Sequence, residues 1–276
     1  MILINGEPSQ FCDSQDRGLH YGHGLFTTLA VMDGQPQLWD YHCRRLLSGA
    51  QRLHIALTEA DCAVLHQEIQ QICQHQSQAL VKIIVTAGVG GRGYALPWPA
   101  QPTRIVARYE LPQTSVMAYQ QGIVLRICQQ RLAAQPRLAG IKHLNRLEQV
   151  LARAEWQDHG IDEGLMLDAQ DRVIEGITSN VFIVWQGQVL TPDLSQCGVA
   201  GVMRQWILER LVEQGIAVTQ ASISLAQLAT ADEVFICNSI RAVLPVKQCD
   251  QWVFVAPGVI TRRIMTWVAD GLKRRG

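Results

Sequence analysis

The hydrophobic residues of this chain recur with two periods, which predict a mixture of strands and helices. A short strand over residues 1–4 ends at an Asn5-Gly6 turn. Residues 40–50 and 59–75 carry apolar side chains at helical spacing. Further strands are predicted at residues 80–86, 103–110, 164–168, 173–185, 189–191 and 234–237, and a helix at residues 202–214.

Another helix is predicted after a loop at residues 135–139. Apolar residues recur at helical spacing from Leu144 to Ala154, and Gly160 suits the end of a helix. Lys142 stands where the loop meets this helix. A lysine between apolar neighbours either snorkels with its head in water or is desolvated, with a lowered pKa that frees the amine to attack carbonyls.

Two later segments favour the desolvated amine. Glu175 lies inside an apolar run, where a carboxylate is costly to bury without a cationic partner. Residues 198–204 place glycines at the start of a helix, and such a helix end binds anions through its backbone N–H groups. An amine, a buried acid and an anion-binding helix end are the three needs of pyridoxal 5′-phosphate (PLP).

The pattern of Lys142, Glu175-Gly176, residues 179–182 and residues 201–204 resembles the fold-type IV PLP enzymes. This group includes branched-chain and D-amino-acid aminotransferases and 4-amino-4-deoxychorismate lyases, and residues 139–151 are most similar to the lyases. The resemblance implies an α+β fold of two α/β domains with the active site in the cleft between them. Residues 111–115 look like a linker, so we expect a smaller N-terminal α+β domain at residues 1–113 and a PLP-binding domain at residues 114–276.

The resemblance also implies roles for particular residues. Lys142 is the expected catalytic residue and forms the Schiff base with PLP. The other expected cofactor contacts are Arg45, Glu175, Asn180, Val202, Met203, Asn238 and Ser239. Arg45 matches the arginine of an H-x-x-R-L motif and would grip the phosphate, although without the family match it reads as a surface arginine on an amphipathic helix. Asn238 departs from the Thr or Ser of many members, toward the lyase pattern.

The expected substrate contacts lie in the N-terminal half. Phe26 and Thr28 share one face of a strand by alternation. Arg92, in a glycine-rich loop, is either a clamp for a substrate carboxylate or a solvated loop arginine.

The implied activity is PLP-dependent conversion of 4-amino-4-deoxychorismate, a small-molecule substrate, to 4-aminobenzoate and pyruvate in folate synthesis. The alternative on the same scaffold is a D-amino-acid or branched-chain aminotransferase. An alternative of another class is a vitamin-B6-binding protein without catalysis. The resemblance further implies a homodimer in which the partner subunit contributes to the site.

Several other functions are disfavoured. The 24 basic and 24 acidic residues balance, which gives no electrostatic case for nucleic acid or an anionic membrane. The basic end at residues 273–275 reads as a solvated tail. The glycines 88, 90 and 93 spell a dinucleotide fingerprint, but Pro97 and Pro99 follow where that fingerprint needs a helix.

Cysteine and histidine usage points to a cytoplasmic protein without a metal. The eight cysteines are scattered, form no CxxC pair and follow no signal peptide, so free thiols in a reducing compartment are expected. His20 and His23 lack the further ligands that a metal site needs. No apolar run approaches the roughly twenty residues that span a bilayer.

Overall fold

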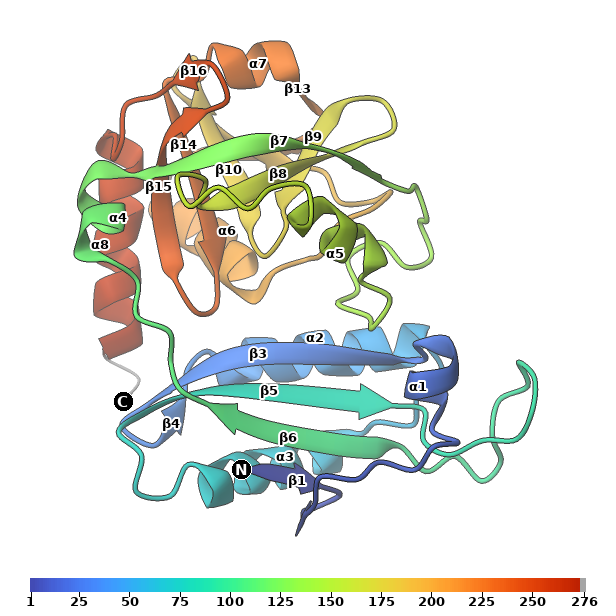
Figure 1. Ribbon diagram of the computed structural model, residues 1–276. Coiled ribbons are helices and arrows are strands. Elements are labelled where there is room, and N and C mark those ends of the chain that lie inside the picture. The colour runs from blue at the N-terminus through green and yellow to red at the C-terminus, as the bar shows by residue number, and fades with distance from the viewer. Residues whose placement is uncertain (274–276) are drawn as a thin grey trace. The chain divides into compact units, whose positions relative to one another are not determined.

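The computed structural model describes residues 1–273, which divide into two compact units (Figure 1). The first comprises Met1–Pro112, Ile141–Asn145 and residues 272–273, and the second comprises Gln113–Gly140 and Arg146–Gly271. The short segment Ile141–Asn145, which the sequence analysis assigned to the C-terminal domain, packs with the first unit because it pairs with one of its strands. Residues 274 and 275 of the expected basic tail lie outside the described residues.

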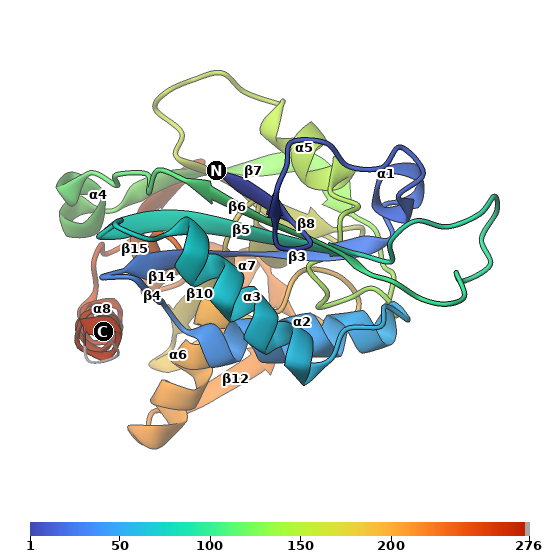
Figure 2. The same cartoon turned by 90° about the horizontal axis from the view of Figure 1, so that it is seen from below.

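The first unit is a six-stranded antiparallel sheet with two helices on one face (Figure 2). The strand order is β2-β1-β6-β5-β3-β4. The elements are β1 (Ile2–Ile4), β2 (Glu7–Pro8), α1 (Arg17–Tyr21), β3 (Gly24–Met32), β4 (Gln35–Pro36), α2 (Trp39–Arg52), α3 (Glu59–Ile72), β5 (Gln78–Thr86) and β6 (Thr103–Tyr109).

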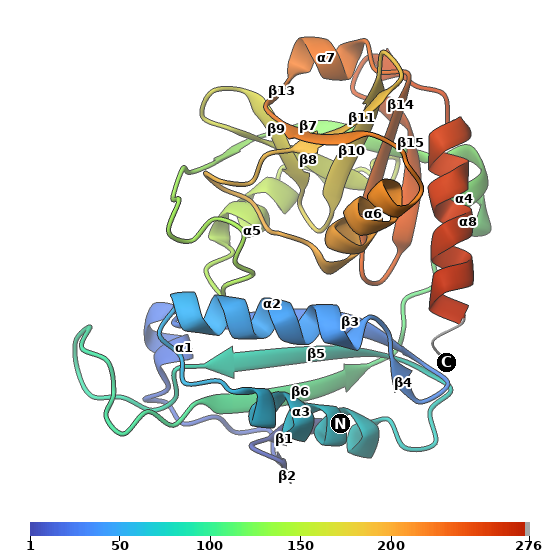
Figure 3. The ribbon, with the colours of Figure 1, turned by 180° about the vertical axis from the view of Figure 1, so that it is seen from behind.

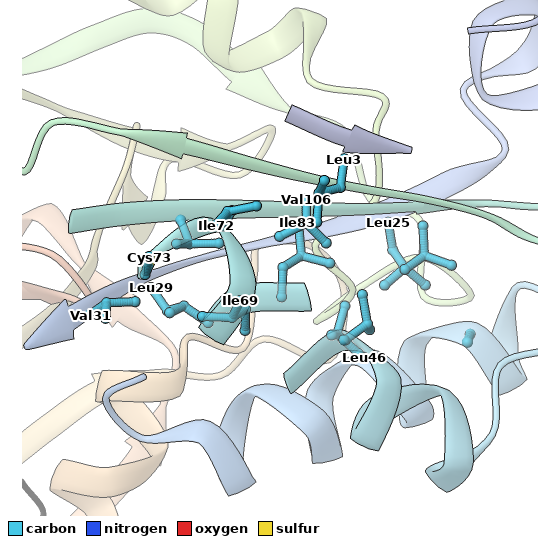
Figure 4. Close-up of a cluster of buried hydrophobic side chains, with 14 of the residues drawn as sticks. Leu3, Leu25, Leu29, Val31, Leu46, Ile69, Ile72, Cys73, Ile83 and Val106 are labelled. Carbon is cyan, nitrogen blue, oxygen red and sulfur yellow. The ribbon is translucent and has the colours of Figure 1, made fainter. Parts of the chain in front are cut away.

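The core of the first unit forms where alternate strand residues meet the two helices. Leu29 of β3 and Ile83 of β5 are fully buried, and they pack in one cluster with Leu46 of α2 and Ile69 of α3 (Figure 4). Each such side chain contributes about 1.5–3 kcal/mol by leaving water. Because the side chains of β3 alternate, Phe26 lies on the opposite face, where it is only half-buried.

The second unit contains the larger sheet. Its elements are α4 (Val116–Gln121), β7 (Ile123–Leu132), α5 (Leu147–Arg153), β8 (Glu163–Asp168), β9 (Arg172–Gly176), β10 (Asn180–Trp185), β11 (Gln188–Pro192), α6 (Val202–Glu213), β12 (Val218–Ala221), β13 (Ile223–Ser224), α7 (Leu225–Ala229), β14 (Glu233–Asn238), β15 (Ala242–Cys249), β16 (Trp252–Val253) and α8 (Val259–Lys273). Helix α6 packs against β14 and β12 (Figure 3).

Six strands of the second unit close on themselves as a barrel. The path runs β10-β14-β15-β7-β8-β9 and returns to β10 through a single pair, Asn180 with Glu175. Inward-facing residues of these strands, such as Val181, Ile236 and Leu165, form the buried core of the barrel. The two residues that close the barrel are both expected cofactor contacts, so the closure brings them side by side.

Two sequence expectations for this unit are wrong in detail. The helix expected to run toward Gly160 is only α5, Leu147–Arg153. Its apolar residues Leu147 and Val150 are exposed, while Gln149 is buried, so helical period alone misjudged which face turns inward. The extended run at residues 173–185 is broken by a turn, in which the Gly176 N–H donates to the Ser179 carbonyl at 2.7 Å. Strand β7 and helix α8 were not anticipated.

Candidate active site

Lys142 belongs to a segment that extends the edge of the first unit's sheet. Strand β4 pairs only with the far end of β3, which leaves the edge of β3 open near Leu25. His143 forms an antiparallel bridge with Leu25, and the Phe26 N–H donates to the Lys142 carbonyl at 2.9 Å. The backbone at Lys142 and His143 is therefore fixed by sheet pairing, although Lys142 lies in a loop.

The Lys142 side chain lies against Phe26. Its Nζ atom is 4.6 Å from the centroid of the Phe26 ring, an arrangement in which the ring face attracts a cation. Thr28 lies two residues farther along β3 on the same half-buried face. The structure therefore brings Lys142 and Phe26 together and keeps Thr28 on their side of the strand.

Arg45 reaches the first unit's sheet from α2. Its Nη2 donates to Thr27 Oγ1 at 2.5 Å, and this hydroxyl lies 2.5 Å from Nδ1 of the fully buried His42. Because Arg45 can only donate, the Thr27 hydroxyl oxygen accepts from it, and the same hydroxyl forms a hydrogen bond with His42 Nδ1. His42 Nε2 is also buried, and it has no hydrogen-bond partner among the described residues.

Burial determines the protonation states of His42 and Arg45. The pKa of His42 is held well below its usual value by burial and by the charges of Arg45 and Lys142, so the imidazole is neutral. Burial also lowers the pKa of Arg45, to about 10, which leaves the guanidinium charged at neutral pH. The Nε of Arg45 is buried and has no hydrogen-bond partner within residues 1–273. Arg45 therefore carries a positive charge, and its Nε can still donate a hydrogen bond to a ligand.

The Glu175 side chain is held in place by a backbone N–H group of the second unit. Its side chain is 3 % exposed, and its Oε2 accepts a hydrogen bond from the Val199 N–H at 2.8 Å. Val199 also forms a parallel bridge with Gly140, two residues before Lys142. Gly140 has a φ of +80°, a conformation that glycine adopts without strain. The loop that contains Val199, whose N–H donates to Glu175, is thus paired with the segment that immediately precedes Lys142.

The start of α6 lies beside Asn180. A Cβ on Gly201, the N-cap residue, would come within 2.0 Å of Asn180 Oδ1, so only glycine fits. Asn180 is buried and donates through Nδ2 to the Val199 carbonyl at 2.8 Å. No side chain caps α6, and its first residues, Val202 and Met203, are buried. The first N–H groups of this helix therefore keep their capacity to bind an anion.

Asn238 ends β14, and Ser239 lies in the turn between β14 and β15. Asn238 Oδ1 accepts from the backbone N–H groups of Ile240 and Arg241, at 2.9 and 2.7 Å. Its Nδ2 donates to the Thr178 carbonyl at 3.4 Å, in the turn between β9 and β10. The Asn238 side chain thus shapes its own turn and joins it to the neighbouring one.

Arg92 is exposed on the loop between β5 and β6. The base of this loop is fixed by Arg17, a buried arginine of α1 that donates to the carbonyls of Gly93 and Tyr94 at 3.1 and 3.4 Å. Arg17 also donates from Nε to His23 Nδ1, so the His23 proton is on Nε2 and is donated to the Leu53 carbonyl at 2.7 Å. His23 thus acts as a structural residue, and the loop has a fixed base beneath Arg92.

These side chains fit PLP. The buried, unpartnered Nε of Arg45 and the uncapped start of α6 suit a phosphate, and Glu175 suits a protonated ring nitrogen. Ser179 Oγ is a further buried hydroxyl, and no described residue forms a hydrogen bond with it. Lys142 supplies the amine for the cofactor aldehyde.

Sequence reasoning missed several residues that shape this site. Thr27 and His42 were not singled out, although His42 stands three residues before Arg45, on the same face of a helix. Glu163 and Arg241, which contact the turns described above, carry no local sequence signal, because their contact joins residues 78 positions apart.

Comparison with known proteins identifies the family. Residues 24–249 match the family model for amino-transferase class IV, and the chain belongs to this family. The crystal structure of 4-amino-4-deoxychorismate lyase from Pseudomonas aeruginosa is 47% identical, with a TM-score of 0.94 and 99% of each chain covered. The aminodeoxychorismate lyase of Vibrio harveyi is 37% identical over 246 residues, which are 89% of this chain and 90% of that protein.

Aminotransferases are also among the relatives. The D-alanine aminotransferase of Bacillus licheniformis is 27% identical over 279 residues, covering 98% of this chain and 96% of that protein. The fold is therefore that of the fold-type IV enzymes, as the sequence predicted, and the cofactor of this family is PLP. Among residues 1–273 no helix is long and apolar enough to cross a membrane.

Proposed function

We propose that the protein is a PLP-dependent lyase that converts 4-amino-4-deoxychorismate to 4-aminobenzoate and pyruvate. The observation that carries this proposal is the 47% identity, over 99% of the chain, to a lyase named for that substrate. The Vibrio harveyi lyase, at 37% identity, supports it independently. Both relatives are more similar to this chain than the D-alanine aminotransferase is.

The cofactor would be held by the contacts expected from the sequence. Lys142 would bond its aldehyde, and Arg45 and the backbone at Val202 and Met203 would bind its phosphate, with Asn238 and Ser239 shaping the phosphate side. Glu175 would face the ring nitrogen, and Asn180 would hold the start of α6. When bound, PLP supplies a ring that accepts electrons from the amine-bearing carbon of the substrate.

Lys142 then moves one proton in two transfers. The Lys142 amine, released when the substrate amine takes its place, would remove the proton from the amine-bearing ring carbon of the substrate. The bond between the neighbouring ring carbon and the enolpyruvyl oxygen breaks, which makes the carbocycle aromatic. Lys142 would return the proton to the departing enolpyruvate, which becomes pyruvate, so atoms balance. The negative charge of Glu175 favours the protonated ring nitrogen throughout.

The substrate contacts would come from the first unit. Phe26 lies against Lys142, and Thr28 shares its face of β3, so both would line the carbocycle. Arg92 would pair with a substrate carboxylate, because a guanidinium binds carboxylates through two parallel hydrogen bonds. The fixed base of its loop at Arg17 supports this role.

A product assay distinguishes the lyase from the aminotransferase on the same scaffold. The purified protein with PLP should release 4-aminobenzoate and pyruvate in equal amounts from 4-amino-4-deoxychorismate. The same preparation should form little keto acid from D-alanine or branched-chain amino acids with 2-oxoglutarate. Rapid transamination without 4-aminobenzoate would overturn the lyase assignment in favour of the aminotransferase.

A homodimer and a cytoplasmic location belong to the same proposal. The exposed apolar residues Leu147, Val150 and Leu151 on α5 support a subunit contact, since monomers rarely leave such a cluster uncovered. All eight cysteines are free, which supports a reducing compartment. Sedimentation at assay concentration should give a dimer, and a fully active monomer would refute it.

A further inference from the structure

One carboxylate, Glu163, joins two turns that the sequence places far apart. Glu163 begins β8 and is 5 % exposed. Its Oε2 accepts from Thr178 Oγ1 at 2.6 Å, in the turn between β9 and β10. The same oxygen accepts from Arg241 Nη2 at 2.8 Å, in the turn between β14 and β15. A single atom therefore sets the spacing of the two turns.

Expected cofactor contacts adjoin the first turn and lie in the second. Thr178 precedes Ser179 and Asn180, and Arg241 follows Asn238 and Ser239 by two or three positions. The turns are joined a second time by Asn238, whose Nδ2 donates to the Thr178 carbonyl. Movement of the Thr178 hydroxyl would therefore displace Ser179, whose buried Oγ has no hydrogen-bond partner in the described chain.

Packing around Glu163 leaves the first turn little room to adjust. A Cβ on Gly176 would lie 2.2 Å from Ser179 Oγ and 3.3 Å from Glu163 Cγ. The glycine thus allows the turn to sit directly on the Glu163 side chain. Thr178 itself is exposed, so its hydroxyl is placed by the hydrogen bond to Glu163 and not by burial.

The charge of Glu163 is balanced locally. Burial raises the pKa of this carboxyl, and the hydrogen bond from Thr178 and the charge of Arg241 oppose that rise. The Arg241 guanidinium is itself largely covered, with 25% of its side chain exposed. The three groups thus satisfy one another, and removing Glu163 or Arg241 leaves the other without its ion-pair partner.

We propose that Glu163 is a positioning residue that holds the 177–179 turn and the 238–241 turn in the register that PLP binding requires. The proposal rests on the proposed function, since it assumes that these turns contact the cofactor. Glu163 touches neither cofactor nor substrate and acts through Thr178 and Arg241. The alternative is that the Glu163–Arg241 ion pair only stabilises the barrel and does not affect cofactor binding.

Thr178 variants test whether Glu163 positions the turns through this hydroxyl, and they do not disturb the core. Thr178→Val keeps the side-chain shape and removes the hydroxyl, whereas Thr178→Ser keeps the hydroxyl. We expect Thr178→Val and Glu163→Gln to weaken PLP binding at least about tenfold, the effect of losing one hydrogen bond to a charged group. The absorption band of bound PLP should shift in both, and Thr178→Ser should bind like the wild type.

Glu233→Gln is the matched control. Glu233 is another buried carboxylate of the second unit, and it accepts from the N–H groups of Ile260 and Thr261 at the start of α8. This variant should lower the melting temperature and leave PLP affinity and the absorption band unchanged. If Glu163→Gln fails to fold, the exposed position Thr178 still decides the question.

The possible results separate the two proposals. A wild type that binds PLP, beside Thr178→Val and Glu163→Gln proteins that match its affinity and band, would overturn the positioning role alone. A wild type that binds PLP but releases no 4-aminobenzoate would refute the lyase assignment. The PLP affinities of the variants would still test the positioning role of Glu163. A wild type that binds no PLP would refute both.

Discussion

The Nζ atom of Lys142 lies 4.6 Å from the centroid of the Phe26 ring. Lys82 of β5 approaches the same ring, at 5.1 Å. Two amines therefore share one aromatic neighbour, and proximity to Phe26 does not decide which of them is the nucleophile. The backbone does: Lys142 follows Gly140, which pairs with the loop that donates to Glu175, whereas Lys82 lies in the middle of a regular sheet.

Replacing Glu175 by glutamine should separate cofactor binding from turnover. The amide can still accept the hydrogen bond from Val199 but carries no charge to favour a protonated ring nitrogen. We expect PLP to stay bound, as absorbance would show, and turnover to fall at least about a hundredfold, the lower end for loss of a well-placed electrostatic group.

Glu148→Gln is the control for this substitution. The charges of Glu148 and Glu175 both raise the pKa of Arg146, against the larger lowering by burial. The control should therefore report any general effect of removing a negative charge there, and we expect its turnover to stay within a few-fold of the wild type. Near-normal turnover of Glu175→Gln with bound PLP would remove Glu175 from the assigned role.

Thr27→Val should weaken PLP binding through Arg45. The valine removes the acceptor that holds Arg45 Nη2, and it leaves His42 Nδ1 without its hydrogen-bond partner. The expected loss of PLP affinity is about tenfold, the effect of one hydrogen bond to a charged group. Thr27→Ser keeps the hydroxyl and should restore the affinity. Equal affinities for the two variants in a fluorescence titration would show that Thr27 does not position Arg45.

The folded protein should lose stability in mild acid, because it buries His42 in the neutral form. Its pKa is below 6.5 in the folded state, so below pH 6.5 the unfolded chain binds a proton that the folded chain does not. The free energy of unfolding should then fall, by up to about 1.4 kcal/mol per pH unit, until the folded-state pKa is reached. Urea unfolding between pH 7 and 5 measures this slope.

The variant His42→Asn should reduce that slope, whatever its own stability at pH 7. His159→Asn serves as the control, because His159 is exposed. An unchanged slope in His42→Asn, with the same slope in the control, would mean that the acid sensitivity arises elsewhere.

The sequence predicted the family, the fold and the burial of Glu175, because these depend on local patterns. A carboxylate within an apolar strand is visible in one dimension, and it is indeed 3 % exposed. The alternation of Phe26 and Thr28 was equally visible, and both lie on the half-buried face of β3. The assigned contacts with PLP and substrate stay predictions.

The relations that the sequence did not predict are those that join distant segments. The pairing of His143 with Leu25 moved residues 141–145 into the first unit, and no periodicity in that segment announces a sheet edge. Glu163 and Arg241 meet only because the barrel closes. For α5, the period was read correctly but the inward face was not, since Gln149 and Ala152 turn inward and the leucines do not.

The central claim, that Lys142 bonds the cofactor, is tested most directly by borohydride reduction followed by peptide mapping. The reduction fixes the pyridoxyl group on whichever lysine carries it. The label should be found on Lys142, and the Lys142→Ala protein should carry no stoichiometric label, while Lys82→Ala is labelled like the wild type. A label on Lys82 or Lys247 in the wild type would contradict the claim.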